Sequence, residues 1–167
     1  MGRGHHEYIN TNEMPWEEIR PGFLTKELSK DKLTGAQSRL LLLKKGVKIS
    51  EYEAHTAGEE GYIIYGKLRE GREGAPDEII FTDGCYFFRP GGLLHGPWEA
   101  VEDTLSFLTL DRKLINIRNP PVWDCPKCKD KMLWQMKVCT NCGKQRPKSA
   151  KRHKMMPEVK TFVSTRR

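Results

Sequence analysis

The chain has 167 residues, of which 37% are hydrophobic and 31% are charged, and its net charge is +7. This composition excludes a wholly disordered chain and is typical of one folded domain with a small appendage. The apolar runs are short, as in Leu40–Leu43, so no stretch of about 20 apolar residues is present to span a bilayer. The N-terminus contains no apolar core of a secretion signal, so we expect a cytoplasmic protein without membrane contact.

The charge is unevenly distributed along the chain. Residues 1–119 hold 16 basic and 19 acidic residues, a net charge of −3, whereas residues 120–167 hold 13 basic and 3 acidic residues, a net charge of +10. Two interpretations of the basic part are open. It is either a solvated flexible tail or a surface for a nucleic acid or an anionic protein partner.

The first segment, residues 1–37, is predicted to be an entry segment in which Trp16 lays its ring on the domain. From Ser38 onward the pattern changes to short segments rich in β-branched and aromatic residues, with Gly, Pro and Asp between them. These segments are Leu40–Val47, Gly61–Leu68, Glu78–Phe81, Cys85–Phe88, Thr104–Leu110 and Lys113–Ile117. No helical periodicity is sustained, so the pattern predicts an all-β sandwich or barrel.

A boundary follows the last of these segments at Asn119, Pro120 and Pro121, because proline cannot donate to a sheet ladder and stiffens the chain. The predicted organisation is an entry segment at 1–37, a barrel at 38–119, a cysteine module at 120–147 and a flexible basic tail at 148–167.

Four side chains in the barrel are candidate metal ligands. Glu53 and His55 are two residues apart and project from the same face of a strand. Glu59 follows after a short turn, and His95 follows a Pro-Gly-Gly turn on a later strand. If the sheet closes, the four converge on a site suited to iron, manganese, nickel or zinc, with positions open to substrate. The alternative is an exposed polar face with a core histidine.

The same residues resemble the first motif of the cupin superfamily. That motif has two histidines two residues apart, then a glutamate, then a glycine seven residues after it. His55, Glu59 and Gly66 match this spacing, and Glu53 stands where the family has its first histidine. The substitution leaves two roles open for Glu53: a metal ligand, or a catalytic base beside metal-bound water.

The second cupin motif is matched throughout. Its glycine, proline, glycine and histidine correspond to Gly84, Pro90, Gly92 and His95. The resemblance implies a cupin double-stranded β-helix, a jelly-roll barrel that holds a divalent metal through Glu53, His55, Glu59 and His95. Cupins frequently form dimers, so a homodimer is expected.

The resemblance also suggests a function. Gly61–Leu68 and the leading Pro15-Trp16 are similar to the group that includes anti-sigma-factor cupin domains and acetylacetone-cleaving dioxygenases. This implies a metal-dependent enzyme with a small-molecule substrate, with dioxygenase as the first reaction type. Lyase or isomerase chemistry would use the same ligands. The alternative is a regulatory cupin that senses a ligand or a metal, with the cysteine module and basic tail binding a partner.

The cysteine module contains two CxxC pairs separated by ten residues: Cys125, Cys128, Cys139 and Cys142. Two such turns supply four thiolates to one tetrahedral ion, so we predict a structural zinc site, with iron as the other candidate. The pattern resembles zinc ribbons and rubredoxin-like knuckles. A redox-active dithiol pair is the alternative.

Overall fold

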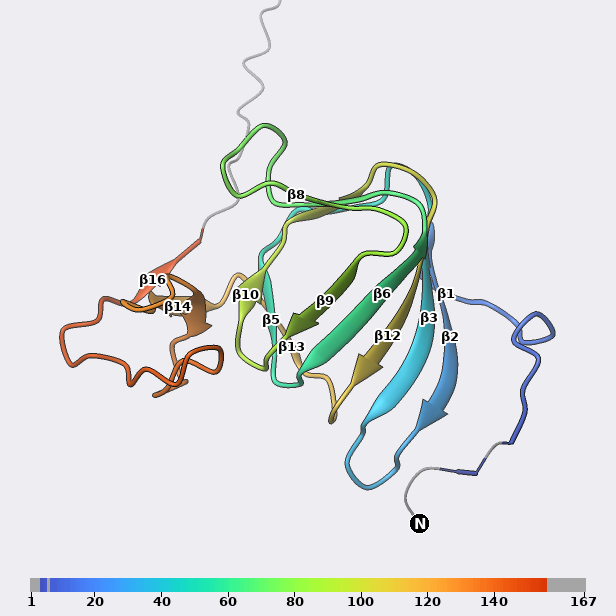
Figure 1. The fold of residues 1–167 in the computed structure, drawn as a ribbon, viewed down its shortest axis with the longest axis horizontal. Helices are drawn as coiled ribbons and strands as arrows, with labels where there is room; N and C mark the ends of the chain where they lie inside the picture. Colours follow the sequence, from blue (N-terminus) through green and yellow to red (C-terminus); the bar gives the residue numbers. More distant parts are fainter. Residues whose placement is uncertain (1–3, 6, 156–167) are drawn as a thin grey trace, which may run out of the picture.

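The computed structural model describes residues 4, 5 and 7–155. Within these residues the chain forms 16 β-strands and no helix, which confirms the predicted all-β class. No described segment forms a helix that could cross a membrane. Figure 1 shows a barrel of long strands with a small module of short strands beside it.

The largest sheet forms one wall of the barrel. Its six strands lie in the order β1 (Glu17–Arg20), β2 (Phe23–Lys30), β3 (Gln37–Leu43), β12 (Thr104–Leu110), β6 (Glu59–Tyr65) and β9 (Tyr86–Arg89), all antiparallel. Two of these strands, β1 and β2, lie within residues 1–37, the predicted entry segment. Trp16 precedes them and lays its ring over Lys26 Nζ at 4.5 Å, so it does pack on the domain.

Two smaller sheets complete the barrel. One has the order β10 (Leu94–His95), β5 (Glu53–His55) and β13 (Asn116–Arg118). The other has the order β4 (Lys48–Ile49), β11 (Trp98–Ala100), β7 (Leu68–Glu70) and β8 (Ile79–Phe81). The first of these sheets carries three of the four predicted metal ligands on adjacent strands.

The barrel core lies between the walls because inward residues alternate with outward ones along each strand. Strand β6 is buried at every second position from Glu59 to Ile63, and β12 is buried at every second position from Thr104 to Leu110. The buried cluster joins the large sheet to the β4–β11–β7–β8 sheet through Leu41, Leu43, Ile63, Leu68, Phe81, Ala100 and Leu108.

The cysteine module packs against the barrel beside β10 (Figure 1). Its sheet has the order β15 (Lys131–Leu133), β14 (Pro121–Asp124) and β16 (His153–Lys154). Strand β16 lies within the predicted basic tail, residues 148–167, whose last part is outside the described residues. A second buried cluster, separate from the barrel core, contains Trp123, Cys125, Met132 and Cys139.

Gly66, the glycine of the first cupin motif, provides a test of this packing. It has a φ of +101°, and a Cβ added there would lie 2.1 Å from the backbone oxygen of Asp103. Gly46 also has a positive φ, +85°, but a Cβ there would meet no atom within 4 Å. We expect Gly66→Ala to lower the free energy of unfolding by about 3 kcal/mol and Gly46→Ala by about 1 kcal/mol, measured by urea denaturation. Equal losses would show that the backbone angle alone, and not the contact with Asp103, requires glycine.

Candidate metal centres

The small sheet β10–β5–β13 brings the predicted barrel ligands together. Strand β5 projects Glu53 and His55 from one short segment, and β10 pairs antiparallel with it so that His95 lies opposite Glu53. The ligand atoms of Glu53, His55 and His95 all lie within 4.8 Å of one another, and all three residues are buried. The rings of the two histidines meet edge to face with centroids 4.5 Å apart.

The hydrogen bonding of His95 fits a metal ligand. Its Nδ1 lies 3.2 Å from the carbonyl oxygen of Leu93, so this nitrogen carries the proton and donates it. Its Nε2 is buried and has no hydrogen-bond partner. A buried polar atom without a partner costs about 1–3 kcal/mol, a cost that a bound cation removes. The second ring nitrogen of a ligating histidine commonly makes this kind of bond to a backbone carbonyl.

Burial tunes the charges of the group toward metal binding. Burial lowers the pKa of His95 well below its usual value, and the nearby charges of Arg89 and His55 act in the same direction. Burial also lowers the pKa of His55, so both imidazoles are neutral at neutral pH, the form that ligates metals. Burial raises the pKa of Glu53, while a hydrogen bond from Asn116 opposes this shift.

Glu59, the fourth predicted ligand, lies beside this group and outside it. Its Oε2 is 3.9 Å from Nδ1 of His55 and 3.3 Å from a guanidinium nitrogen of Arg89. Arg89 also forms an ion pair with Glu70. The separation from His55 is too long for a hydrogen bond, so Glu59 is held by Arg89.

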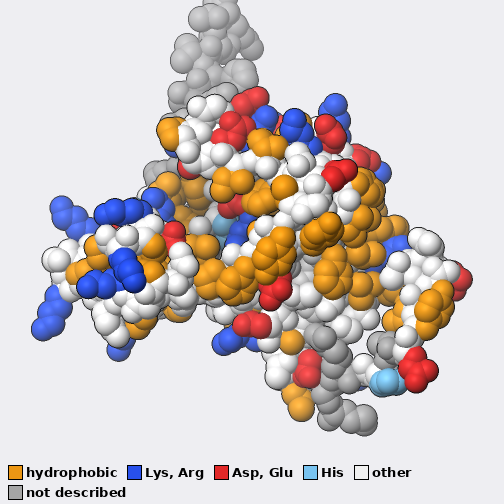
Figure 2. All heavy atoms as spheres, viewed as in Figure 1, with side chains coloured by type: hydrophobic (Ala, Val, Ile, Leu, Met, Phe, Trp, Pro, Cys, Tyr) orange, Lys and Arg blue, Asp and Glu red, His pale blue; other side chains and the backbone are white. Residues whose placement is uncertain are grey.

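Two cavities adjoin the barrel group. Glu53, His55 and Glu59 line a cavity of about 260 Å³ inside the barrel. His95 lines a cleft of about 520 Å³, whose wall also includes Arg89 and, from the cysteine module, residues 129–131. On the face shown in Figure 2, a hollow rimmed by hydrophobic side chains lies between the barrel and the module.

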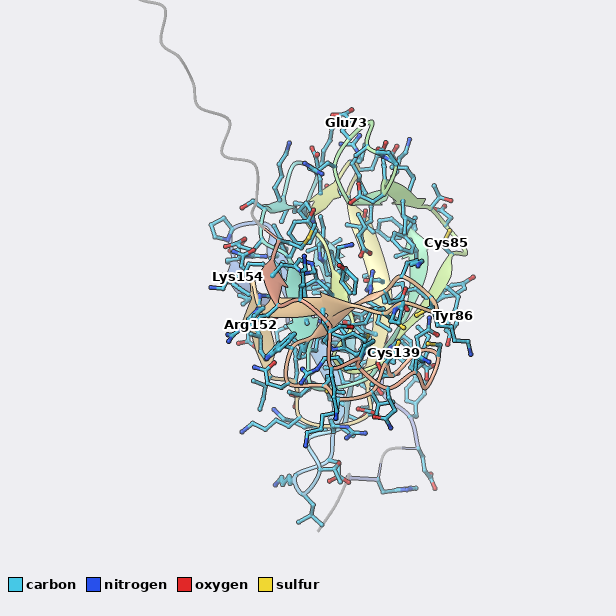
Figure 3. All side chains as sticks on the ribbon, turned by 90° about the vertical axis from the view of Figure 1, so that its left-hand side faces the viewer. Glu73, Cys85, Tyr86, Cys139, Arg152 and Lys154 are labelled. Atoms are coloured by element: carbon cyan, nitrogen blue, oxygen red, sulfur yellow. The ribbon has the colours of Figure 1, made fainter. Side chains whose placement is uncertain are left out.

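The four cysteines form a second centre. Their sulfur atoms all lie within 4.8 Å of one another, and the pairs Cys125–Cys142 and Cys128–Cys139 are each 3.5 Å apart. These are free thiols, not disulfides. A tetrahedral ion with bonds of about 2.3 Å sets neighbouring sulfurs about 3.8 Å apart, so the cluster fits one ion with four protein ligands. Figure 3 shows Cys139 within the module, which faces the viewer.

The backbone around Cys125 favours its thiolate, whereas burial raises the pKa of Cys139. Burial alone would raise the pKa of Cys125, but the backbone N–H groups of Cys128 and Lys127 donate to its sulfur, and the pKa is lowered to about 6. The thiolate is the form that binds metal. The geometry therefore supports the structural ion predicted from the two CxxC pairs.

The cysteine module forms hydrogen bonds with the turn that carries the second cupin motif. The amide of Leu133 donates to the carbonyl of Gly92 at 2.9 Å, and the hydroxyl of Thr140 donates to the carbonyl of Gly91 at 3.0 Å. Leu93 pairs with Met132 in an isolated bridge. Since Leu93 also accepts the hydrogen bond from His95, the two centres are connected through one turn.

Sequence reasoning missed several polar residues around the barrel group. Arg20, Arg39, Asn116 and Arg118 line the 260 Å³ cavity with Glu53 and His55. The signal was present only for Arg39, which alternates with Leu41 and Leu43 along β3 and so shares their inward face.

Solved structures share this fold at low sequence identity. An RmlC-like cupin from Shewanella frigidimarina is 20% identical, with a TM-score of 0.53 over 66% of this chain and 93% of that chain. KdgF from a Halomonas species is 18% identical, with a TM-score of 0.52 over 64% and 95%. A protein from Methylibium petroleiphilum, provisionally assigned as an acetylacetone dioxygenase, is 14% identical, with a TM-score of 0.56 over 74% and 83%.

Sequence comparison gives the family. No curated protein sequence matches the chain. A family model described as the ChrR cupin-like domain matches residues 5–114, which include both cupin motifs and the three clustered ligands. Because this match covers more than half of the 167 residues, and the fold agrees with it, the chain belongs to the ChrR cupin-like domain family.

Proposed function

We propose that this protein is a metal-dependent enzyme that acts on a small organic molecule inside the barrel. The observation that carries the proposal is the buried group of Glu53, His55 and His95, in which Nε2 of His95 lacks a partner and the other two residues line a cavity. Two imidazoles and one carboxylate suit iron, manganese, nickel or zinc and leave positions for substrate. The four cysteines hold a structural zinc or iron ion.

The bound ion, Glu53 and the cavity wall would have different roles in the reaction. A divalent ion held there would supply Lewis acidity to a substrate oxygen. Burial raises the pKa of Glu53, so its carboxylate is a stronger proton acceptor than a solvated one and can receive a proton from the substrate. The seven apolar residues among the fourteen that line the cavity would pack against the carbon atoms of a substrate: Ile19, Phe23, Leu41, Ile49, Trp98, Leu108 and Leu114.

Dioxygenase chemistry is the reaction type that we propose first. The sequence resemblance to acetylacetone-cleaving cupins supports it, and so does the fold shared with the Methylibium petroleiphilum protein. The test is substrate-dependent oxygen uptake by metal-loaded protein across a panel of diketones, phenols, hydroxy acids and oxo acids. Absence of both oxygen uptake and any other turnover across the panel would contradict an enzymatic role.

A regulatory role is the second candidate, because the cysteine module presents an unneutralised basic surface. Eight exposed cations of the module and of the described part of the tail form no ion pair with any residue that the structure describes: Lys127, Lys129, Lys137, Lys144, Lys148, Lys151, Arg152 and Lys154. Arg152 and Lys154 lie close together at one side of the module in Figure 3. Such a surface suits a nucleic acid or an acidic protein partner. For a nucleic acid, affinity should fall steeply as salt rises, and an affinity for duplex DNA that stays flat between 50 and 200 mM salt would contradict that partner.

The metal content of His95→Ala tests the barrel centre. Protein purified without a histidine tag or chelator should contain about two ions per chain, and His95→Ala should contain about one, because the variant loses the unpartnered Nε2. Elemental analysis measures both. His5→Ala, which alters a histidine exposed at the N-terminal end, is the control and should keep both ions. A ratio near one in native protein, unchanged in His95→Ala, would mean that only the cysteines bind metal.

The variant Glu53→Gln separates the two roles open for Glu53. If Glu53 is a ligand, the amide weakens metal binding and the ion content falls by about one per chain. If Glu53 is a base, the ion content stays the same and turnover falls about 100-fold or more, since an amide cannot accept the proton. Glu51→Gln is the matched control, because Glu51 is the neighbouring carboxylate and faces Arg118 at 3.6 Å.

The variant Cys139→Ser tests the cysteine centre and its grip on the barrel. Loss of one of four thiolates should remove the structural ion and lower the thermal midpoint of unfolding. Because the module holds the turn before His95, the barrel site should also bind its ion about tenfold more weakly. Metal titration followed by elemental analysis measures both effects. Cys85→Ser, at the cysteine outside the module, should leave both sites unchanged. Full barrel affinity in Cys139→Ser would show that the module does not support His95.

A further inference from the structure

Arg39 occupies an unusual place on the inward face of β3. Strand alternation puts it on the same side as Leu41 and Leu43, and with Leu41 it lines the 260 Å³ cavity beside Glu53 and His55. Arginine seldom points toward a barrel core, because burying a guanidinium is costly unless an anion or acceptors satisfy its donors. Arg39 is half-buried, and the cavity that it lines is where a partner for it would lie.

No protein group satisfies Arg39. Its Nε is buried without a hydrogen-bond partner, and its side chain forms no ion pair with any residue that the structure describes. Burial lowers the pKa of the guanidinium, and only the more distant charge of Glu59 opposes this shift. Glu59 itself is engaged by Arg89. The Nε of Arg39 is thus left without an acceptor in the wall of the cavity.

The rest of the cavity favours an anion of small size. Arg20 and Arg118 add two more positive charges to its lining. Arg118 lies 3.6 Å from Glu53, and the guanidinium of Arg20 lies over the ring of Phe23 at 4.8 Å. Of the two carboxylates in the lining, Glu59 is paired with Arg89 and Glu53 with Arg118, which also pairs with Glu51, so neither is paired with Arg39. A volume of about 260 Å³ is below the usual range for drug-sized ligands, so the ligand is small.

We propose that Arg39 binds the carboxylate of the substrate, and that the substrate class is small oxo acids. This inference rests on the proposed function and narrows it. The planar fork of arginine matches a carboxylate with two parallel hydrogen bonds, which a lysine cannot form. The oxo group of the same molecule would face Glu53 and His55, which line the same cavity. Arg39 is then a specificity-determining residue, since neutral diketones would leave its donors unsatisfied.

Calorimetric titration with pyruvate and with its uncharged methyl ester tests the proposal. Native protein should bind pyruvate at least about tenfold more tightly than methyl pyruvate. Arg39→Gln should abolish this preference while the metal content stays unchanged, and Arg39→Lys should retain part of it. Arg112→Gln, at an exposed arginine paired with Asp111, is the matched control and should bind like native protein. If Arg39→Gln does not fold, Arg39→Lys provides the decisive comparison.

Three outcomes would overturn the inference. The first is equal affinity for pyruvate and its ester, and the second is equal pyruvate affinity in native protein and both Arg39 variants. The third is no binding of pyruvate, acetoacetate or 2-oxobutyrate to native protein.

The failure of the proposed function would give a different set of results. Protein that binds pyruvate through Arg39 but holds no barrel metal and turns nothing over would contradict the enzyme and leave Arg39 as a carboxylate-binding residue. An active, metal-loaded enzyme that is indifferent to Arg39→Gln would contradict only the substrate class.

Discussion

The turn at residues 90–93 is the constraint on which both centres depend. The amide of Gly92 donates to the carbonyl of His55 at 2.7 Å, and the carbonyl of Gly92 accepts from Leu133 in the cysteine module at 2.9 Å. Gly92 thus ties the strand that carries two barrel ligands, Glu53 and His55, to the module that carries the thiolates. Gly92 has a φ of +87°, and a Cβ there would lie 3.0 Å from Met136 of the module. Both requirements favour glycine at this point.

The module and the barrel differ in what stabilises them. The module is too small to build a large core of its own, and its buried cluster consists mainly of two cysteines, Trp123 and Met132. Its folding therefore draws on metal binding, as in other small thiolate domains. The barrel has an independent core between its sheets. The metal of the module consequently supports the module first, then the turn at 90–93, and through Leu93 the ring of His95.

Two arginines of the barrel, Arg89 and Arg39, differ in whether protein carboxylates neutralise them. Arg89 is buried between Glu59 and Glu70, so its cost of burial is offset by protein carboxylates. Arg39 is not offset in this way, although it is close enough to Glu59 for the two charges to interact. The difference separates a structural arginine from one whose partner comes from outside. It is the contrast between the two, within one barrel, that points to an anionic ligand.

The sequence predicts those features of the structure that depend on the spacing of residues within a short segment. The two cupin motifs predicted the barrel and the convergence of His55 and His95, and the CxxC pairs predicted the sulfur cluster, because turns and strand alternation fix these geometries locally. Strands β1 and β2 were not predicted, since buried polar residues interrupt the apolar pattern of β2: Thr25 on its inward face and Lys26 on the opposite face against Trp16. Arg39 was missed for the same reason: a charged residue in a strand is normally read as solvent-facing. The position of Glu59 outside the three-residue group depends on Arg89, a long-range contact that no local pattern contains.

The cysteine module also forms part of the wall of the cleft beside His95. Residues 129–131 of the module and His95 of the barrel line the same 520 Å³ cleft, while Glu53 and His55 line the 260 Å³ cavity. Because these three ligands lie within 4.8 Å of one another, the candidate metal group stands between the two spaces. One space is walled only by the barrel, and the other is completed by the module. The module therefore contributes to the surroundings of the barrel centre in two ways: it holds the turn that leads to His95, and it closes the side of the cleft that His95 faces.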